Sequence, residues 1–217
     1  MFYYCESMAI ETACFISYRH RKSAEAIELV RAIHDELREQ LSLIIEEEPF
    51  WDASLDYGEI FTDRFAAVIS RSACMLVAYT PVYALGDYSR AEFKTMEIIE
   101  HCRLSRLGDK AKRSDGMIIP IILKKHPKDD DHPDPWLPHE VQGKYHYFDI
   151  SPYILSGARN LRKHRKFKEE ISRIADYIVR VKKMIERDPD HCNNCKSEIV
   201  RGVPEWGASD VEKFPLR

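Results

Sequence analysis

The chain has 217 residues, 44% of them hydrophobic and 32% charged, which is an ordinary balance for a globular domain with its own core. Its net charge of −3 excludes a general electrostatic preference for nucleic acid or acidic membranes. No apolar run suits a membrane span, and the first twelve residues lack the features of a secretory signal. The six cysteines are scattered, and Cys14 and Cys74 fall in strand-like runs, as buried thiols in a reducing compartment do. These features predict a cytoplasmic protein.

Apolar runs that suit strands alternate with segments that have helical spacing. The predicted strands are residues 12–18, 43–45, 74–79, 117–123 and 145–150. The predicted helices are residues 27–41, which Ser23 can cap, residues 61–69, a helix that opens at Ser89, and residues 167–185, which Pro189 ends. Pro120 lies inside the fourth strand and predicts a bulge or an unpaired edge there.

This alternation predicts an α/β fold, in which a parallel sheet is covered by helices on both faces. Right-handed crossovers leave few topologies, and the common order for five strands is 2-1-3-4-5, a flavodoxin-like doubly wound sheet. Its switch point lies between the first and third strands, where such folds bind ligands. Residues 17–19 and residues 80–92 follow those two strands. We therefore expect both segments to line one crevice.

Glu92 stands just beyond the carboxyl end of the third predicted strand and has two interpretations. In the first, it presents a working carboxylate to the crevice. In the second, Ser89 and Glu92 form a capping box, in which the glutamate bonds back to the start of its own helix. On these local residues alone the capping box is the better interpretation.

Three further clusters carry weaker signals. His191, Cys192 and Cys195 supply half of a zinc site, but a structural zinc needs four ligands and no second pair follows, so no metal site is predicted. A basic run is read as the solvated start of a surface helix rather than as a nucleic-acid site. It comprises Arg159, Arg162, Lys163, Arg165, Lys166 and Lys168. Residues 129–132 are read as a solvated acidic loop.

Three segments, correctly ordered and spaced, together resemble the TIR domain, the Toll/interleukin-1 receptor and plant resistance module. Residues 15–19 look like the first signature box of that family. Residues 50–58 look like the end of its second strand and the following loop, and residues 72–92 look like its third strand and the helix after it. The resemblance implies a TIR domain over residues 8–187, with residues 188–217 as a C-terminal tail that carries the CxxC motif. The fold of the family is the flavodoxin-like sheet predicted above.

Many TIR domains, bacterial ones included, cleave NAD at the bond to nicotinamide. The resemblance implies Glu92 as the catalytic glutamate, and it implies a substrate-binding set that matches positions of the family motifs. That set is Tyr18, Arg19, Asp52, one of Ile60 and Phe61, and Tyr88, which stands where the family often has tryptophan. For Tyr18, Arg19, Asp52 and Tyr88, an ordinary role in packing, in a turn or in solvent remains an equal alternative.

One carboxylate could suffice for this reaction. Glycoside cleavage usually needs a second carboxyl group to protonate the leaving oxygen, but the nicotinamide of NAD is already a cationic pyridinium and leaves as a neutral base. A carboxylate can stabilise the oxocarbenium-like ribose that remains. Tyr18 and Tyr88 could stack on the nicotinamide, and Arg19 could pair with a phosphate. Whether the product is linear or cyclic ADP-ribose stays open.

The resemblance further implies a stand-alone bacterial protein of anti-phage defence, with NAD as substrate and no cofactor. Members of the family usually self-associate through TIR–TIR contacts, because one copy completes the site of the next. A downstream effector would sense the nucleotide product. The alternative is a catalytically silent TIR module that signals by self-association, which the tyrosine at position 88 favours.

Overall fold

Five parallel strands form a single sheet in the order β2-β1-β3-β4-β5. The computed structural model describes residues 10–19, 24–51, 68–83, 86–111, 115–125, 145–154 and 157–187, except for the side chains of Asp87, Tyr88, Lys110 and Arg159. The strands are β1 (Thr12–Tyr18), β2 (Pro49–Phe50), β3 (Ser72–Tyr79), β4 (Ile118–Ile122) and β5 (Phe148–Asp149). The sheet order confirms the predicted flavodoxin-like α/β fold.

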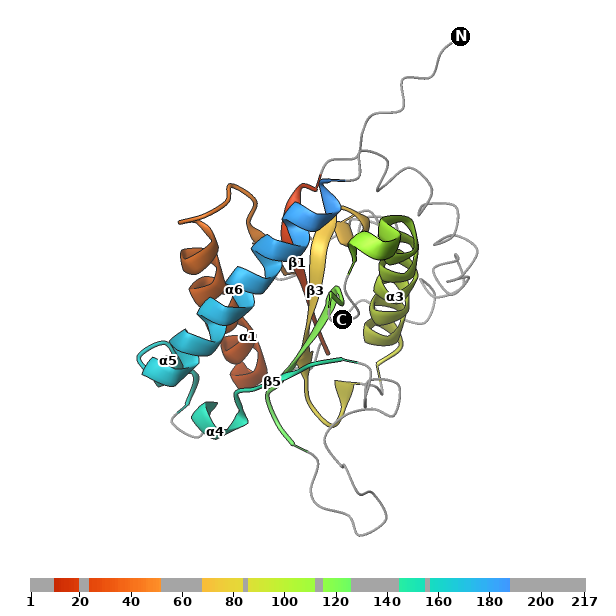
Figure 1. Cartoon of the computed structure of the whole chain (residues 1–217). Helices are drawn as coiled ribbons and strands as arrows, with labels where there is room; N and C mark the ends of the chain where they lie inside the picture. Colours follow the sequence, from red (N-terminus) through yellow and green to blue (C-terminus); the bar gives the residue numbers. More distant parts are fainter. Residues whose placement is uncertain are drawn as a thin grey trace.

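Helices cover both faces of this sheet (Figure 1). The helices that lie entirely within the described residues are α1 (Ala24–Leu41), α3 (Asp87–Leu107), α4 (Ser151–Ile154), α5 (Ala158–Leu161) and α6 (Arg165–Ile185), with the 3-10 turn η3 (Gly108–Lys110). Helices α1 and α6 pack together on one face, and α3 lies on the other (Figure 1). All eight residues of β3 are buried, as expected for a central strand covered on both sides.

The predicted second strand at residues 43–45 is wrong. The chain turns there directly after α1, and the amides of Ile44 and Ile45 donate to the carbonyl of Leu41 over 2.8 and 2.9 Å. Leu43 is 83% exposed. The strand beside β1 is instead β2, where Phe50 stacks on Phe15 with ring centroids 5.7 Å apart. Three apolar residues in a row carry no periodicity, so the pattern could not separate an exposed turn from an edge strand.

The fourth strand runs through Pro120 without a bulge. Its pairing with β3 is continuous, with Val77 opposite Pro120, whereas its pairs with β5 begin only at Ile121. The proline therefore lies on a stretch paired on one side, which is one of the two predicted arrangements. The fifth strand is shorter than predicted, because only Phe148 and Asp149 pair with β4.

Cys14 and Cys74 are free thiols inside the sheet, as predicted. They stand opposite each other in β1 and β3, and neither is exposed. Burial raises the pKa of both thiols well above the ordinary value, so both stay protonated and unreactive.

The C-terminal half of α3 is fixed to the start of β3 by a buried arginine. The side chain of Arg103 is 1% exposed. Its Nη1 donates to the carbonyl of Ser72 over 2.8 Å and its Nη2 to the carbonyl of Ser70 over 2.7 Å. A planar guanidinium can serve two carbonyl groups at once, which explains why a charged side chain occupies this site.

A buried glutamate one turn earlier fixes the same helix to the start of β4. The Oε2 atom of Glu100 accepts from the amides of Met117 and Ile118 over 2.5 and 3.2 Å. Its Oε1 atom accepts from the hydroxyl of Tyr145 over 3.1 Å. Glu100 and Arg103 therefore hold α3 at the amino-terminal edge of the sheet, the edge opposite the predicted crevice.

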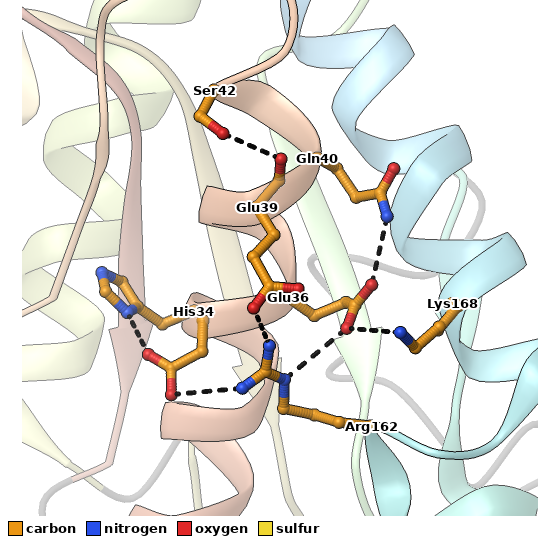
Figure 2. Close-up of polar contacts among 8 residues, drawn as sticks. His34, Glu36, Glu39, Gln40, Ser42, Arg162 and Lys168 are labelled. Atoms are coloured by element: carbon orange, nitrogen blue, oxygen red, sulfur yellow. Dashed lines mark hydrogen bonds and ion pairs between the residues drawn. The ribbon is translucent and has the colours of Figure 1, made fainter.

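A group of charged side chains, called here the interhelical charge cluster, joins α1 to α6 and to the segment between α5 and α6 (Figure 2). The cluster consists of Asp35, Glu36, Glu39, Arg162 and Lys168. The side chain of Glu36 is fully buried, and its Oε2 lies 3.6 Å from Nε of Arg162 and 3.7 Å from Nζ of Lys168. Arg162 also pairs with Glu39 and, at 4.0 Å, with Asp35. Two members of the predicted basic run therefore meet acidic residues of α1, and a third, Arg165, pairs with Glu169 of its own helix.

Replacing Asp149 with asparagine is expected to lower the free energy of unfolding by about 1 kcal/mol at pH 7. Burial raises the pKa of Asp149, but hydrogen bonds from Lys125 and Ser151 outweigh burial and leave that pKa below its ordinary value. Lys125 Nζ lies 2.6 Å from Oδ2, and the hydroxyl of Ser151 donates to Oδ1 over 2.6 Å.

A carboxyl group whose pKa is lower in the folded state stabilises the fold above its unfolded-state pKa of about 3.9, and this contribution disappears as the pH falls through the folded-state pKa. The difference in unfolding free energy between wild type and Asp149→Asn, measured with urea, should therefore shrink as the pH falls below about 4. The exposed Asp176, changed to asparagine, is the control. A difference that stays constant with pH would contradict the expectation.

Candidate functional site

The position at which α3 begins decides whether Ser89 can be its N-cap. The helix begins at Asp87 with Gly86 as its N-cap, two residues earlier than predicted, so Ser89 lies within the first turn. The hydroxyl of Ser89 donates to the carbonyls of Tyr83 and Gly86 over 2.8 and 3.1 Å. The capping-box interpretation is therefore wrong, because Ser89 is not the N-cap.

The carboxylate of Glu92 instead reaches across to β1. The hydroxyl of Ser17 donates to Oε2 of Glu92 over 2.5 Å. Ser17 is the penultimate residue of β1 and stands opposite Val77 of β3, so this contact lies near the carboxyl ends of the two strands that flank the switch point. Glu92 is only 2% exposed. A buried carboxylate thus stands at the place where the sheet topology predicts a ligand site.

Tyr83, in the segment after β3, completes a small cluster of polar groups. Its hydroxyl oxygen lies 2.7 Å from Oγ of Ser17 and 3.3 Å from the carbonyl oxygen of Ser89. Burial raises the pKa of Tyr83 above its ordinary value, and the negative charge of Glu92 raises it further, against a smaller lowering by the hydrogen bond with Ser17. The phenol is therefore protonated at neutral pH. We call Ser17, Tyr83 and Glu92 the hydroxyl–carboxylate cluster.

Arg19 ties the end of β1 to the segment after β3. Its Nη1 donates to the carbonyl of Val82 over 2.5 Å. Gly86 lies beside both segments: a Cβ atom there would be in ordinary contact with Cγ of Arg19 at 3.5 Å but would crowd Oγ of Ser89 at 2.5 Å. Arg19 therefore lies at the predicted crevice with one guanidinium nitrogen on a backbone carbonyl. Its pairing with a phosphate stays a prediction.

Tyr18 lies on the other face of the sheet. Neighbouring residues of a strand point to opposite faces, so Tyr18 points away from the side on which Ser17 meets Glu92. The ring of Tyr18 packs against Trp51 at 6.1 Å between centroids, and Trp51 in turn contacts His34 of α1 at 5.8 Å. Tyr18 is 7% exposed. The structure thus brings Arg19 and Glu92 to one region and places Tyr18 beside α1.

The remaining predicted site residues lie outside the described part of the chain. They are Asp52, Ile60 and Phe61, together with the side chain of Tyr88, whose backbone belongs to the first turn of α3. His191, Cys192, Cys195 and the whole of residues 188–217 also lie outside it. Within the described ranges, no group of three or more histidine, cysteine or acidic side chains could hold a metal ion. Among the helices of those ranges, none is long and apolar enough to cross a membrane.

Ser17 and Tyr83 are the site residues that the sequence analysis missed. Ser17 is a polar residue near the end of an otherwise apolar predicted strand, and it lies in a segment assigned to the switch point. That combination is a usable signal, because a hydroxyl in a covered strand needs a hydrogen-bond partner. Tyr83 has no comparable signal, since a tyrosine after a strand commonly just packs there.

The fold and the hydroxyl–carboxylate cluster define a flavodoxin-like α/β protein with a buried carboxylate at the switch point of its sheet. No protein-family model matches the chain, and searches of curated proteins and of solved structures gave no significant match. The resemblance to the TIR domain therefore rests on the three sequence segments and on the shared class of fold.

Proposed function

We propose that this protein cleaves NAD at the bond between nicotinamide and ribose, with Glu92 as the catalytic carboxylate. The observation that carries the proposal is the hydrogen bond from Ser17 to Oε2 of Glu92. It brings a carboxylate from the start of α3 to the end of β1, where α/β sheets bind ligands. The expected local alternative, a capping box on Ser89, does not account for this side chain.

The chemistry needs only one carboxylate. When the bond breaks, its electron pair stays with the pyridinium nitrogen, and nicotinamide leaves as a neutral molecule. The ribose becomes oxocarbenium-like, and the anionic carboxylate of Glu92 stabilises that positive charge in a site shielded from water. Addition of water then gives ADP-ribose and a proton, while attack by a nucleophile of the substrate itself gives a cyclic product.

Burial of the carboxylate sets a condition on activity. Glu92 is 2% exposed, so NAD can reach it only after the side chains over it move. The resemblance to the TIR domain suggests self-association as the event that completes the site. Activity should therefore rise steeply with protein concentration.

The test follows nicotinamide release from NAD by the concentrated full-length protein. Replacing Glu92 with glutamine keeps the shape of the side chain and removes its charge, and we expect nicotinamide release to fall at least about a hundredfold. Glu97→Gln, in the same helix on a half-buried side chain that pairs with Lys94, is the matched control and should retain activity. The enzyme proposal fails if wild type is as inert as Glu92→Gln in a sample that light scattering shows to be assembled.

A catalytically silent module that signals by TIR–TIR contact is the second candidate. The near-complete burial of Glu92 favours it, since a carboxylate held by Ser17 can also serve only to join β1 to α3. In that case wild type and Glu92→Gln would release no nicotinamide at any concentration, and self-association would remain the measurable property.

A further inference from the structure

The hydroxyl–carboxylate cluster joins three segments that are far apart in the sequence. Ser17 comes from β1, Tyr83 from the segment after β3 and Glu92 from α3. Their exposed fractions are 1%, 4% and 2%, so water contributes little to their hydrogen bonding. Each hydroxyl has a single proton to donate, and this restriction fixes how the three groups can bond to one another.

When Glu92 is ionised, the hydrogen bonds of the cluster can run in only one order from donor to acceptor. A carboxylate can only accept, so Ser17 must use its single proton on Oε2 of Glu92. The 2.7 Å contact between the Ser17 and Tyr83 oxygens then needs Tyr83 as its donor. If Glu92 were protonated instead, the order would reverse, with Glu92 donating to Ser17, Ser17 to Tyr83, and Tyr83 to the carbonyl of Ser89 at 3.3 Å.

We propose that Ser17 and Tyr83 are positioning residues for Glu92. Tyr83 orients the hydroxyl of Ser17, and Ser17 holds the carboxylate in one orientation and favours its ionised form. The expected effect on the rate of NAD cleavage rests on the function proposed above. The expected effect on the ionisation of Glu92 does not.

The size of the expected effect follows from the kind of hydrogen bond. A hydrogen bond from a buried hydroxyl to a charged oxygen changes an equilibrium or a rate by about ten- to a hundredfold. Removing the hydroxyl of Ser17 should therefore raise the titration midpoint of Glu92 by about one pH unit. Removing the hydroxyl of Tyr83 should shift the midpoint in the same direction by less, because Ser17 still donates.

The other ionisable groups near the cluster are the same in every variant, so their effects on the titration midpoint of Glu92 cancel when variants are compared. Strand β4 carries no titratable side chain. The described titratable or charged residues of the remaining neighbouring segments are Cys14, Tyr18 and Arg19 at β1, Cys74 and Tyr79 in β3, and Arg90 and Lys94 in the first two turns of α3.

The first experiment is independent of any enzyme activity. The full-length protein is labelled with carbon-13 in the glutamate carboxyl groups, and the resonance of Glu92 is identified by its loss in Glu92→Gln. We expect its midpoint to rise by about one unit in Ser17→Ala, by less in Tyr83→Phe, and to stay near wild type in Ser17→Thr, which keeps the hydroxyl. An unchanged midpoint in Ser17→Ala would overturn the proposal. If Ser17→Ala fails to fold, Tyr83→Phe decides by the same criterion, and an unchanged midpoint in that variant overturns the proposal.

The second experiment measures nicotinamide release by the same variants. Ser17→Ala should lower kcat by at least about tenfold with little change in KM, and Ser17→Thr should restore most of it. An unchanged kcat in Ser17→Ala overturns the positioning role even if the midpoint has shifted. If wild type releases no nicotinamide, the proposed function fails, and the titration still decides whether Ser17 and Tyr83 control Glu92.

Discussion

Replacing Arg103 with methionine is expected to lower the free energy of unfolding by about 3–5 kcal/mol. The guanidinium is 1% exposed and donates to the backbone carbonyls of Ser70 and Ser72 at the start of β3. Methionine fills part of the same volume but donates no hydrogen bond, so each carbonyl loses one donor in a place that water does not reach. An unmet buried polar group costs about 1–3 kcal/mol, and two are affected here.

Urea unfolding of the full-length protein checks this expectation, with Lys94→Met as the control. Lys94 is an exposed cation of the same helix, and its replacement should change the unfolding free energy by less than about 0.5 kcal/mol. Arg103→Lys should fall between wild type and Arg103→Met, because a single ammonium group cannot reproduce the fork that serves both carbonyls. A loss below about 1 kcal/mol in Arg103→Met would show that α3 is not anchored through this side chain.

Replacing Arg162 with methionine is expected to lower the free energy of unfolding by about 2–4 kcal/mol. This change removes a cation of the interhelical charge cluster and leaves the fully buried carboxylate of Glu36 with Lys168, 3.7 Å away, as its remaining ion-pair partner (Figure 2). A buried charge that loses one of its partners is costly, because the interior cannot solvate it as water does. The amide of Gln40, 3.1 Å from Oε1 of Glu36, offsets only part of this cost.

A double-mutant cycle with Glu36→Gln separates the cluster from simple loss of packing. Neutralising Glu36 removes the buried charge that the replacement of Arg162 would otherwise leave with fewer partners. The double variant should therefore lose less unfolding free energy than the two single variants lose together, by at least about 1 kcal/mol. Because Glu36 is buried, this coupling should persist at high salt, unlike that of an exposed pair. Additive losses, or a coupling that salt abolishes, would contradict the expectation.

The elements with strong patterns were predictable from the sequence. Helix α6 buries Phe167, Ile171, Ile174 and Ile178 completely, and these residues follow the helical spacing by which the helix was predicted. Strand β3 was predicted from an uninterrupted apolar run, which is typical of a strand covered on both faces. With these elements fixed, right-handed crossovers left few sheet orders, and the order expected for a flavodoxin-like fold is the one found.

Features that depend on partners distant in the sequence were not predictable. The charged side chains of Glu100 and Arg103 can be buried in α3 because they form hydrogen bonds with backbone groups at the starts of β4 and β3. No local sequence pattern contains that information. The same holds at the other end of the helix. The residues around Ser89 and Glu92 satisfied a local capping rule, yet the helix begins earlier and Ser17, 75 residues away, binds the glutamate.

The shortness of the two outer strands bears on how copies of this protein could polymerise. Strand β2 pairs through two residues, Pro49 and Phe50, and β5 through two others, Phe148 and Asp149. Such short edges offer little backbone for another chain to extend the sheet, and a proline at one of them has no amide proton to give. If copies of this protein self-associate as proposed, extension of the sheet from one copy to the next is therefore not the expected mode of contact.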